Sequence, residues 1–301
     1  MCIRDRLTLT FDETVDVTTL MVNEFILVGD PVSLDPAYNL TIGYSPSEDD
    51  YIIVVQLDID DVNNLKRTVN LTVTRESTNL VLSPLAIADM NDNALNFTDP
   101  LTASTFQEDT RQPVLVAFDL DLDSDLLVLE FNETVLVSSL NITDIIIHDS
   151  VNGTLDSNSS QRYYALQYSL PLSGDDPVIY IHLHPDDINY IKKFDNLASS
   201  SNNSFLTVTS NLITDMNTNL LMATSDLPVR DYTRDTTSPK LVEYYLDLTA
   251  ELLTLVFNET VNVSSSDASQ LTLSGGNTTQ VDLISAPNTP CLLYTSDAAD
   301  E

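Results

Sequence analysis

The sequence contains only two cysteines, six glycines and no tryptophan among 301 residues, and its 12 lysines and arginines face 46 aspartates and glutamates. Cys2 and Cys291 lie in terminal segments that are set aside below, so the rest of the chain has no disulfide, cysteine zinc site or thiol nucleophile. The net charge of −34 argues against nucleic acid and anionic membranes as partners, because phosphate groups would be repelled. No apolar run approaches the roughly 20 residues that a membrane helix needs, so no membrane insertion is expected.

The two ends of the sequence resemble translated sequencing-adaptor DNA of the transposase type. Residues 1–6 can be encoded by one strand of such DNA, and residues 291–296 by the opposite strand in a shifted frame. We therefore interpret 1–6 and 291–301 as artefactual adaptor-derived ends. Without them the net charge is −32, and the remainder is expected to be an internal piece of a longer protein.

One nine-residue stretch occurs three times, at 7–15, 127–135 and 253–261. In each copy large apolar residues alternate with polar ones, for example Leu127, Leu129 and Phe131. A period of two predicts a strand with one buried face. The Asp/Asn-Glu-Thr that follows is expected to break the strand and turn the chain.

The repeat extends well beyond this stretch. Asp60, Asp89 and Asp109 each have a counterpart 126 residues later, whereas Phe11 and Phe131 are 120 apart, which predicts a six-residue insertion at about 156–161. A period near 126 is longer than a solenoid repeat and is about the size of a small domain. We expect an N-terminally truncated repeat at 7–110, a complete repeat at 111–236 and a C-terminally truncated repeat at 237–290.

The complete repeat reads as about seven short strands. They are expected at 113–119, from Leu127, and at 145–148, 163–170, 178–183, 206–213 and 220–224, the last two forming a hairpin around 215–219. Regularly spaced turn signals between short strands are typical of an all-β, two-sheet sandwich. Because glycine is scarce, Asn, Asp and Ser must form the turns.

One short crossover helix is expected in each repeat, at 60–67 and 186–193. Ile188 and Ile191 are three residues apart, so one face can dock on the core. Acidic residues at the start and basic residues at the end suit the helix dipole. The basic residues either complement that dipole or form a patch that binds a partner.

The motifs resemble bacterial Ig-like repeats of the SbsA type. Those repeats carry Phe-Ser-Glu-Pro-Val and Asp-x-x-Gly-Asn where this chain has Phe-x-Glu-x-Val and Asp-Met-x-x-Asn. Thr14, Thr134 and Thr260 stand in place of the usual proline, and Asp92 and Thr218 in place of the usual glycine. The resemblance implies tandem Ig-like β-sandwich domains in a large surface, S-layer or adhesive protein outside the cell, with no catalytic residues.

Two acidic groups are candidate calcium sites. Residues 89–93 are similar to the cadherin calcium signature Asp-x-Asn-Asp-Asn, so that Asp89, Asn91 and Asp92 offer hard oxygen ligands, although residues 215–219 lose the central acid. A hairpin turn is the alternative interpretation. The second group alternates along the chain, which would crowd it on one strand face and favour either cation binding or a solvated acidic edge; it consists of Asp119, Asp121, Asp123 and Asp125.

Residues for catalysis are scarce. His182 and His184 are two apart on a predicted strand and form a candidate zinc pair, but the first repeat has Gln56 and Asp58 there. The sequence contains no Gly-rich phosphate loop, Gly-x-Ser-x-Gly or His-Glu-x-x-His. We therefore predict no enzymatic activity and no cofactor other than calcium.

Eleven Asn-x-Ser/Thr sequons are candidate glycosylation sites if the protein follows a eukaryotic secretory route. They begin at Asn39, Asn70, Asn96, Asn132, Asn141, Asn152, Asn158, Asn202, Asn258, Asn262 and Asn277.

The sequence thus predicts a non-catalytic structural or adhesive segment of an extracellular or cell-surface protein, which contacts neighbouring repeats and an unidentified protein or glycan ligand. One alternative is a calcium-dependent, cadherin-like adhesion array. Another is an ancillary module of a secreted polysaccharide-degrading enzyme.

Overall fold

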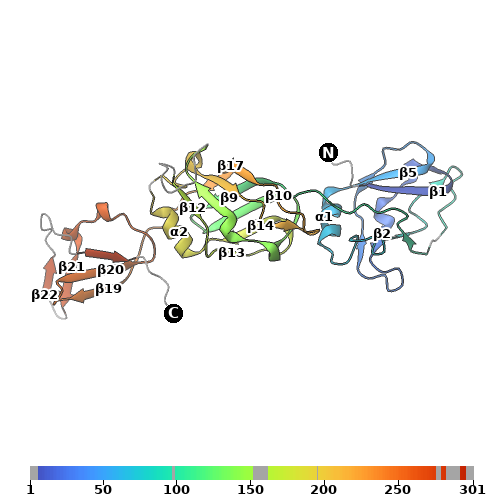
Figure 1. Cartoon of the computed structure of the whole chain (residues 1–301). Coiled ribbons are helices and arrows are strands. Elements are labelled where there is room, and N and C mark those ends of the chain that lie inside the picture. The colour runs from blue at the N-terminus through green and yellow to red at the C-terminus, as the bar shows by residue number, and fades with distance from the viewer. Residues whose placement is uncertain are drawn as a thin grey trace.

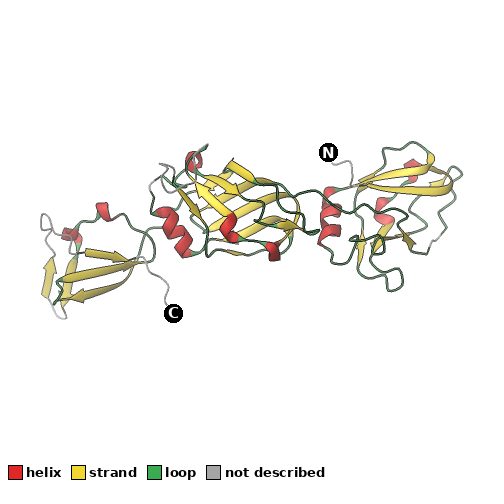
Figure 2. Ribbon diagram, in the orientation of Figure 1, coloured by secondary structure: helices red, strands yellow, loops and turns green. Residues whose placement is uncertain are grey.

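The computed structural model describes residues 6–96, 99–151, 162–194, 196–275, 279–282 and 292–295. Three β-rich units follow one another in a row, with helix α1 (Ile59–Arg67) between the first two and helix α2 (Pro185–Lys192) between the last two (Figures 1 and 2). Strands dominate every unit, which confirms the predicted all-β class. The finer Ig-like assignment stays a prediction.

The second unit contains two β-sheets. One has the strand order β13-β14-β10-β9-β18, with β16 also pairing with β10, and the other has the order β12-β11-β15-β17. Its strands are β9 (Leu115–Asp121), β10 (Leu126–Leu136), β11 (Ile145–His148), β12 (Tyr163–Ala165), β13 (Leu170–Pro171), β14 (Asp176–His182), β15 (Phe205–Val208), β16 (Thr214–Asp215), β17 (Thr224–Pro228) and β18 (Asp231–Thr233).

The core of this unit is built by the predicted alternation. Leu127 and Leu129 of β10 and Ile145 and Ile147 of β11 are fully buried in one apolar cluster with Phe118 of β9. Burying a side chain of this size contributes about 1.5–3 kcal/mol, so the residues of the repeated stretch stabilise the unit through their positions at every second residue.

Helix α2 crosses from one sheet to the other, between β14 and β15, and a buried carboxylate fixes its first turn. Asp187 is fully buried and accepts hydrogen bonds from the Tyr164 hydroxyl, the backbone N–H groups of Gln167, Tyr168 and Ser169, and the Ser169 hydroxyl. Burial opposes ionisation, but these donors hold the pKa of Asp187 below its usual value. The helix is therefore tied to the loop that precedes β13.

The first unit repeats this arrangement without counterparts of β9 and β18 among its described residues. Its sheets have the orders β4-β5-β1-β7 and β3-β2-β6-β8, and Asp61 anchors α1 as Asp187 anchors α2. The strands are β1 (Arg6–Asp16), β2 (Phe25–Val28), β3 (Ala37–Asn39), β4 (Gly43–Tyr44), β5 (Asp50–Leu57), β6 (Asn79–Leu82), β7 (Ala88–Asp89) and β8 (Leu101–Thr102).

The third unit consists of a hairpin, a second strand pair and one further strand in its described part. β19 pairs antiparallel with β20, β21 pairs with β22, and β23, inside the 291–301 segment set aside above, runs parallel to β20. These strands are β19 (Leu241–Asp247), β20 (Leu252–Phe257), β21 (Thr272–Gly275), β22 (Thr279–Asp282) and β23 (Leu292–Thr295).

The Asp/Asn-Glu-Thr stretch does not end its strand in the first two units. β1 and β10 run through it, with a shift of register between Glu130 and Val135 in β10. The chain turns later, in paired 3-10 turns that follow each copy: Val17–Thr19 and Val22–Glu24, Val137–Ser139 and Ile142–Asp144, Val263–Ser265 and Ala268–Gln270. A further 3-10 turn spans Ser201–Asn203. The predicted break is therefore wrong for the first two units, where a bulge absorbs the polar residues without interrupting the strand. In the third unit β20 ends at Phe257, directly before the stretch, as predicted.

Other boundaries also differ from prediction. The hairpin of 206–213 with 220–224 is wrong, because β15 pairs with β17 and only an isolated bridge joins Thr214 to Leu220. The single strand at 163–170 is divided into β12 and β13. The pairs Ile26–Asn39 and Ile146–Ala165 are equivalent, which places the six extra residues between β11 and β12; the predicted stretch 156–161 lies outside the described residues.

Candidate functional site at the junctions between units

The two junctions between units contain the same pair of hydrogen bonds. At the first, the Thr134 N–H donates to Asn63 Oδ1 at 3.2 Å and the Thr134 hydroxyl donates to the Asn63 carbonyl at 3.2 Å. At the second, the Thr260 N–H donates to Asn189 Oδ1 at 2.9 Å and the Thr260 hydroxyl donates to the Asn189 carbonyl at 3.0 Å. Each residue lies 126 positions after its counterpart, so the repeated sequence builds a repeated interface.

A lysine of the same helix reinforces each junction. Lys66 Nζ lies 2.5 Å from Asp109 Oδ2 and also forms an ion pair with Glu133. Asp109 belongs to the linker between the units, and Glu133 directly precedes the threonine of the docking pair. Lys66 therefore holds both the linker and the following unit.

The second junction repeats this arrangement with Lys192. Its Nζ lies 2.7 Å from Asp235 Oδ2 and 3.0 Å from Glu259 Oε2. The other oxygen of Glu259, Oε1, is buried and has no hydrogen-bond partner in the described structure. Because this carboxylate is largely buried, removing Lys192 would leave its negative charge without compensation and would destabilise the junction.

The position of these residues on the helix explains how one short helix serves two units. Asn63 and Lys66 are three residues apart and share a face, which is turned toward the next unit. Leu65 lies two positions from Asn63, on the other side of the helix, and packs into the core of its own unit. One face of α1 thus stabilises the first unit while the opposite face docks the second.

Three carboxylates meet at the first junction. Oxygen atoms of Asp109, Glu133 and Asp215 lie within 4.8 Å of one another, and the side chains of Glu133 and Asp215 are buried. Burial raises the pKa of Glu133 despite the nearby ammonium group. Burial also opposes ionisation of Asp109, but the hydrogen bonds from Lys66 and the Arg111 N–H, together with the charge of Lys66, lower its pKa. The contacts with Lys66 in turn raise the pKa of that lysine. The ammonium therefore compensates a site that is rich in negative charge.

The turn that contains Asp215 fixes the linker. Asn219 Nδ2 donates to the Asp109 carbonyl at 3.0 Å, and Asp215 accepts hydrogen bonds from the N–H groups of Asn217 and Asn219. Thr218 adopts a left-handed φ of 66°, and its counterpart Asp92 a φ of 62°, at the positions where the Ig-like repeats have glycine. The Asp-Met-Asn stretch thus shapes a turn that restrains the connection between units.

The predicted acidic group of the second unit is spread over different environments. Asp119 pairs with Arg230, whose guanidinium also contacts Glu130. Asp121 accepts from the N–H groups of its own turn, and Asp123 accepts from the N–H and hydroxyl of Thr236 in the linker. The expectation of one shared strand face was wrong, because β9 ends at Asp121.

The last member of that group, Asp125, lies in the turn with a φ of 57°. Burial raises the pKa of its carboxyl, and Lys192 acts against this shift. The cadherin-like Asp89 accepts from Asn91 N–H, Asn93 N–H and Asn93 Nδ2, and Asp92 is exposed at the apex of the same turn. Neither of the two predicted calcium groups lies with the three carboxylates of the first junction. Asp215, one of those three, is the counterpart of Asp89 in the second repeat.

Two of the three histidines have structural partners. His184 caps α2 by accepting the Asp186 N–H, and buried His148 contacts the Ser150 carbonyl and the Thr207 hydroxyl. His182 lies near the end of β14. Among the described residues no metal-ligand group includes a histidine.

All sequons within the described residues are exposed at their asparagine. Asn132 and Asn258 also accept the N–H groups of Val114 and Lys240, so they help to pair the strands. Asn152, Asn158 and Asn277 lie outside the described residues.

The sequence patterns did not predict that Asn63, Asn189 and the Glu-Thr pairs join neighbouring units. Of the two interpretations of the basic helix ends, the contacts of Lys66 and Lys192 with the linker and the next unit agree with a binding patch. A signal for the docking residues was nevertheless present, because Asn-x-x-Lys occurs at 63–66 and 189–192 and Glu-Thr occurs in all three repeated stretches. In the first copy, which has no preceding helix in the described structure, Glu13 and Thr14 are exposed. Their counterparts Glu133 and Thr134 are buried, so the repeat of Glu-Thr marks a docking surface.

No helix in the described part of the chain is both long enough and apolar enough to cross a membrane. Comparisons with protein-family models, with curated proteins and with solved structures found no match.

Proposed function

We propose that this chain is a non-catalytic, structural or adhesive segment of a large extracellular or cell-surface protein, in which Ig-like repeats are held in a fixed relative orientation. The observation that carries the proposal is the recurrence of one docking contact at both junctions, atom for atom. A spacer must hold the domains at its two ends at a defined distance and orientation. A specific contact repeated at every junction restrains that geometry better than a flexible linker does.

The contacts at each junction are strong enough to favour the docked orientation. Two hydrogen bonds contribute about 0.5–1.5 kcal/mol each and bonds to charged groups about 1.5–3 kcal/mol. Asn63 and Thr134 are buried, so separating the units requires water to reach groups that the docked state shields. We therefore expect the undocked orientation to be the minor state.

The surface supports a location outside the cell. The chain carries a net charge of −34, has exposed sequons throughout its described part, and places both cysteines in the terminal segments. A strongly charged, sugar-accepting surface keeps an elongated array soluble and separate from its neighbours.

A calcium-dependent, cadherin-like array is the second candidate, and one observation favours it. The carboxylates of Asp109, Glu133 and Asp215 are close enough to share a cation. Lys66 already contacts two of them, so we favour docking by the ammonium group. Calorimetric titration with Ca²⁺, and melting with and without chelator, decide between the two: a calcium-dependent rise in melting temperature supports the array. The third candidate, an ancillary module of a polysaccharide-degrading enzyme, is not favoured by any contact described above.

Small-angle X-ray scattering of the full chain tests the spacer proposal. The native chain should fit one extended arrangement, whereas Asn63→Ala with Asn189→Ala should give a broader distribution of shapes. The matched control is Asn96→Ala with Asn202→Ala, two exposed asparagines away from the docking pairs. If the native chain is as flexible as the docking variant, the proposed rigid spacer is wrong.

A further inference from the structure

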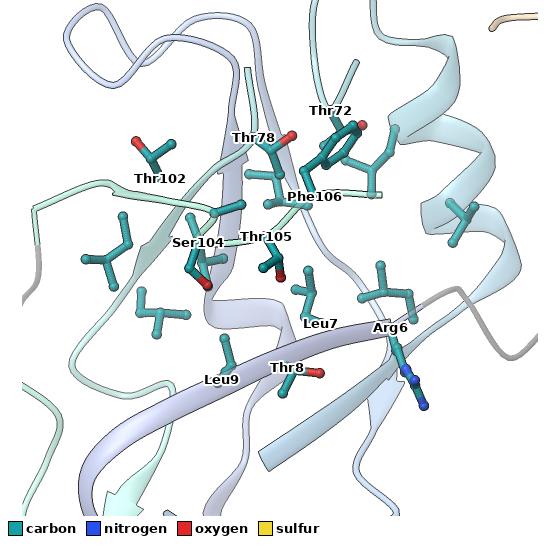
Figure 3. Close-up of a pocket in the computed structure, with 18 of the residues that line it drawn as sticks. Arg6, Leu7, Thr8, Leu9, Thr72, Thr78, Thr102, Ser104, Thr105 and Phe106 are labelled. Atoms are coloured by element: carbon teal, nitrogen blue, oxygen red, sulfur yellow. The ribbon is translucent and has the colours of Figure 1, made fainter. Parts of the chain in front are cut away.

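The pocket beside β1 is continuous with the first junction. Figure 3 shows Leu7 and Leu9 of β1 at this pocket, with Phe106 lying across from them. Lys66 and Glu133 line the same pocket, so it belongs to the site described above. A separate apolar surface lies at the edge of the second unit, on β13 and β14.

Three cross-strand pairs build this surface. Leu170 pairs with His182, and the Leu172 N–H donates to the Tyr180 carbonyl at 2.7 Å. One pair further along, the rings of Tyr168 and His184 are 5.6 Å apart. Side chains of directly opposite residues share one face of a sheet. The six side chains therefore form a continuous band, called the lateral stripe below, which consists of Tyr168, Leu170, Leu172, Tyr180, His182 and His184.

The apolar members of the lateral stripe are exposed, although the second unit lies between two others (Figure 1). Leu170 and Leu172 are 67% and 64% exposed, and Tyr168 and Tyr180 are 56% and 45% exposed. Ile181, whose side chain points to the other face of β14, is fully buried in the core. A contiguous apolar surface of this kind marks an interaction site.

The first unit has an equivalent surface. Ile42 and Tyr44 lie 126 positions before Tyr168 and Leu170, and they are 66% and 53% exposed. Their strand, β4, is the edge strand of its sheet, as β13 is in the second unit. The repeat therefore keeps large apolar side chains at one edge, while the residue types differ between the two copies.

The lateral stripe is suited to side-chain contacts and not to the addition of a further strand. β13 has only two residues, and one of them is Pro171. Because the neighbouring Leu172 N–H points to β14, position 171 faces away from the sheet, where a proline offers no N–H group. Short edge strands and edge prolines prevent strand pairing. A partner must therefore lie across the exposed face.

The charges around the lateral stripe favour a basic partner. Residues 163–191 contain no lysine or arginine, and neither do residues 7–65 of the first unit. Asp186 lies 3.5 Å from His184 at one end of the stripe, and Asp175 directly precedes β14 at the other end. An acidic partner would be repelled, and this includes a second copy of the chain with its net charge of −34.

We propose that the lateral stripe binds an extended segment of a basic protein, whose apolar side chains pack on Leu170 and Leu172 while its basic groups lie near the flanking aspartates. This partner class serves the adhesive role and rests on the function proposed above. Leucine has no hydrogen-bonding group to offer to sugar hydroxyls, which favours protein side chains over a glycan. Because the surface recurs 126 residues away, a partner with two such segments gains avidity by binding two repeats.

Fluorescence anisotropy of the labelled peptide Lys-Lys-Leu-Ser-Leu-Ser-Leu-Lys-Lys, titrated with the full chain, tests the proposal. Its leucines alternate as the pairs of the stripe do, and its lysines flank them. We expect saturable binding that weakens as salt is raised. A peptide with serine in place of leucine should bind weaker by a factor of about ten or more, because the apolar contacts are lost.

Variants of the chain locate the binding site. Tyr44→Ser with Leu170→Ser and Leu172→Ser should weaken binding by a factor of about ten or more. The matched control removes three exposed apolar side chains elsewhere and should stay within about twofold. It combines Val32→Ser, Leu85→Ser and Met222→Ser, at positions that are 91%, 69% and 51% exposed. Circular dichroism verifies that each variant keeps its fold.

Three results would overturn the proposal. Equal binding of the serine peptide, or equal losses in the two triple variants, would show that the peptide responds to net charge alone. Binding of neutral cellohexaose that only the stripe variant loses, without binding of the peptide, would assign the surface to a glycan. A native chain that fits one extended arrangement in scattering but binds no peptide would refute the binding surface and leave the spacer proposal intact.

Discussion

Replacing Lys66 by methionine removes the one ammonium group that contacts two carboxylates at the first junction while keeping the length and apolar stem of the side chain. The substitution leaves Asp109, Glu133 and Asp215 within 4.8 Å without that compensation. We expect the first two units to undock from each other while each keeps its own fold, because Lys66 lies outside both apolar cores.

The size of the effect follows from the burial of the pair. Removing one partner of a fully buried ion pair costs about 3–5 kcal/mol, and an exposed pair contributes about 0–1 kcal/mol. The side chains of Lys66, Asp109 and Glu133 are 22%, 21% and 8% exposed, which places this junction between the two limits. An intermediate loss of about 2 kcal/mol lowers the docking equilibrium constant roughly 30-fold, since 1.36 kcal/mol is a factor of ten.

Spin labels can measure the docking directly. Val32 of the first unit and Leu172 of the second are 91% and 64% exposed, so labelled cysteines there should not disturb either core. With Cys2 and Cys291 replaced by serine, double electron–electron resonance should give a narrow distance distribution for the native junction and a broad one for Lys66→Met.

A control separates the loss of the contact from the loss of one positive charge. Arg75→Met removes a cation from the first unit, but Arg75 is exposed and lies 3.9 Å from its neighbour Glu76, away from the junction. Its distance distribution should stay narrow. An equally narrow distribution for Lys66→Met would refute the argument that the ammonium group holds the junction.

Three further outcomes are expected. In Lys66→Met, millimolar Ca²⁺ should narrow the distance distribution again, because the three carboxylates offer hard oxygen ligands once the ammonium group is gone; no response in either the distances or a calorimetric titration would contradict this. Asp187→Asn should lower the free energy of unfolding of the second unit at neutral pH by about 1–3 kcal/mol, because it removes a carboxylate that accepts several buried hydrogen bonds. These hydrogen bonds lower the pKa of Asp187, so they stabilise the fold at any pH above the unfolded pKa of about 4. The stabilisation is lost as pH falls through the lower folded pKa. Urea unfolding should accordingly show a native advantage that shrinks in acid, and an advantage that grows in acid would reverse the sign. Phe118→Ala should cost the second unit about 3–5 kcal/mol, whereas Val116→Ala on the exposed side of the same strand should stay within about 0.5 kcal/mol in the same measurement.

The local pattern of the sequence was sufficient for the repeated strand and for the crossover helix of the first two repeats. Alternating Leu127, Leu129 and Phe131 predicted a strand with one buried face, and acids before bases predicted both crossover helices. A strand or a short helix depends on residues close to one another in the chain, so it can be predicted from hydrophobic periodicity and local composition. The strand break predicted at Asp/Asn-Glu-Thr is wrong for the first two units, because polar residues can also sit in a bulge within a continuing strand, as they do in β1 and β10.

The sequence by itself determined that the chain is a series of all-β repeats about 126 residues apart, because spacing and alternation are properties of the chain order. Only the tertiary structure decided what the repeats do to one another. Asn63 and Thr134 are 71 positions apart, and neither differs in type from dozens of polar residues on the surface. Folding brings them together through α1 and β10, and it is this long-range contact, rather than any local motif, that distinguishes a docking surface from an ordinary polar strand end.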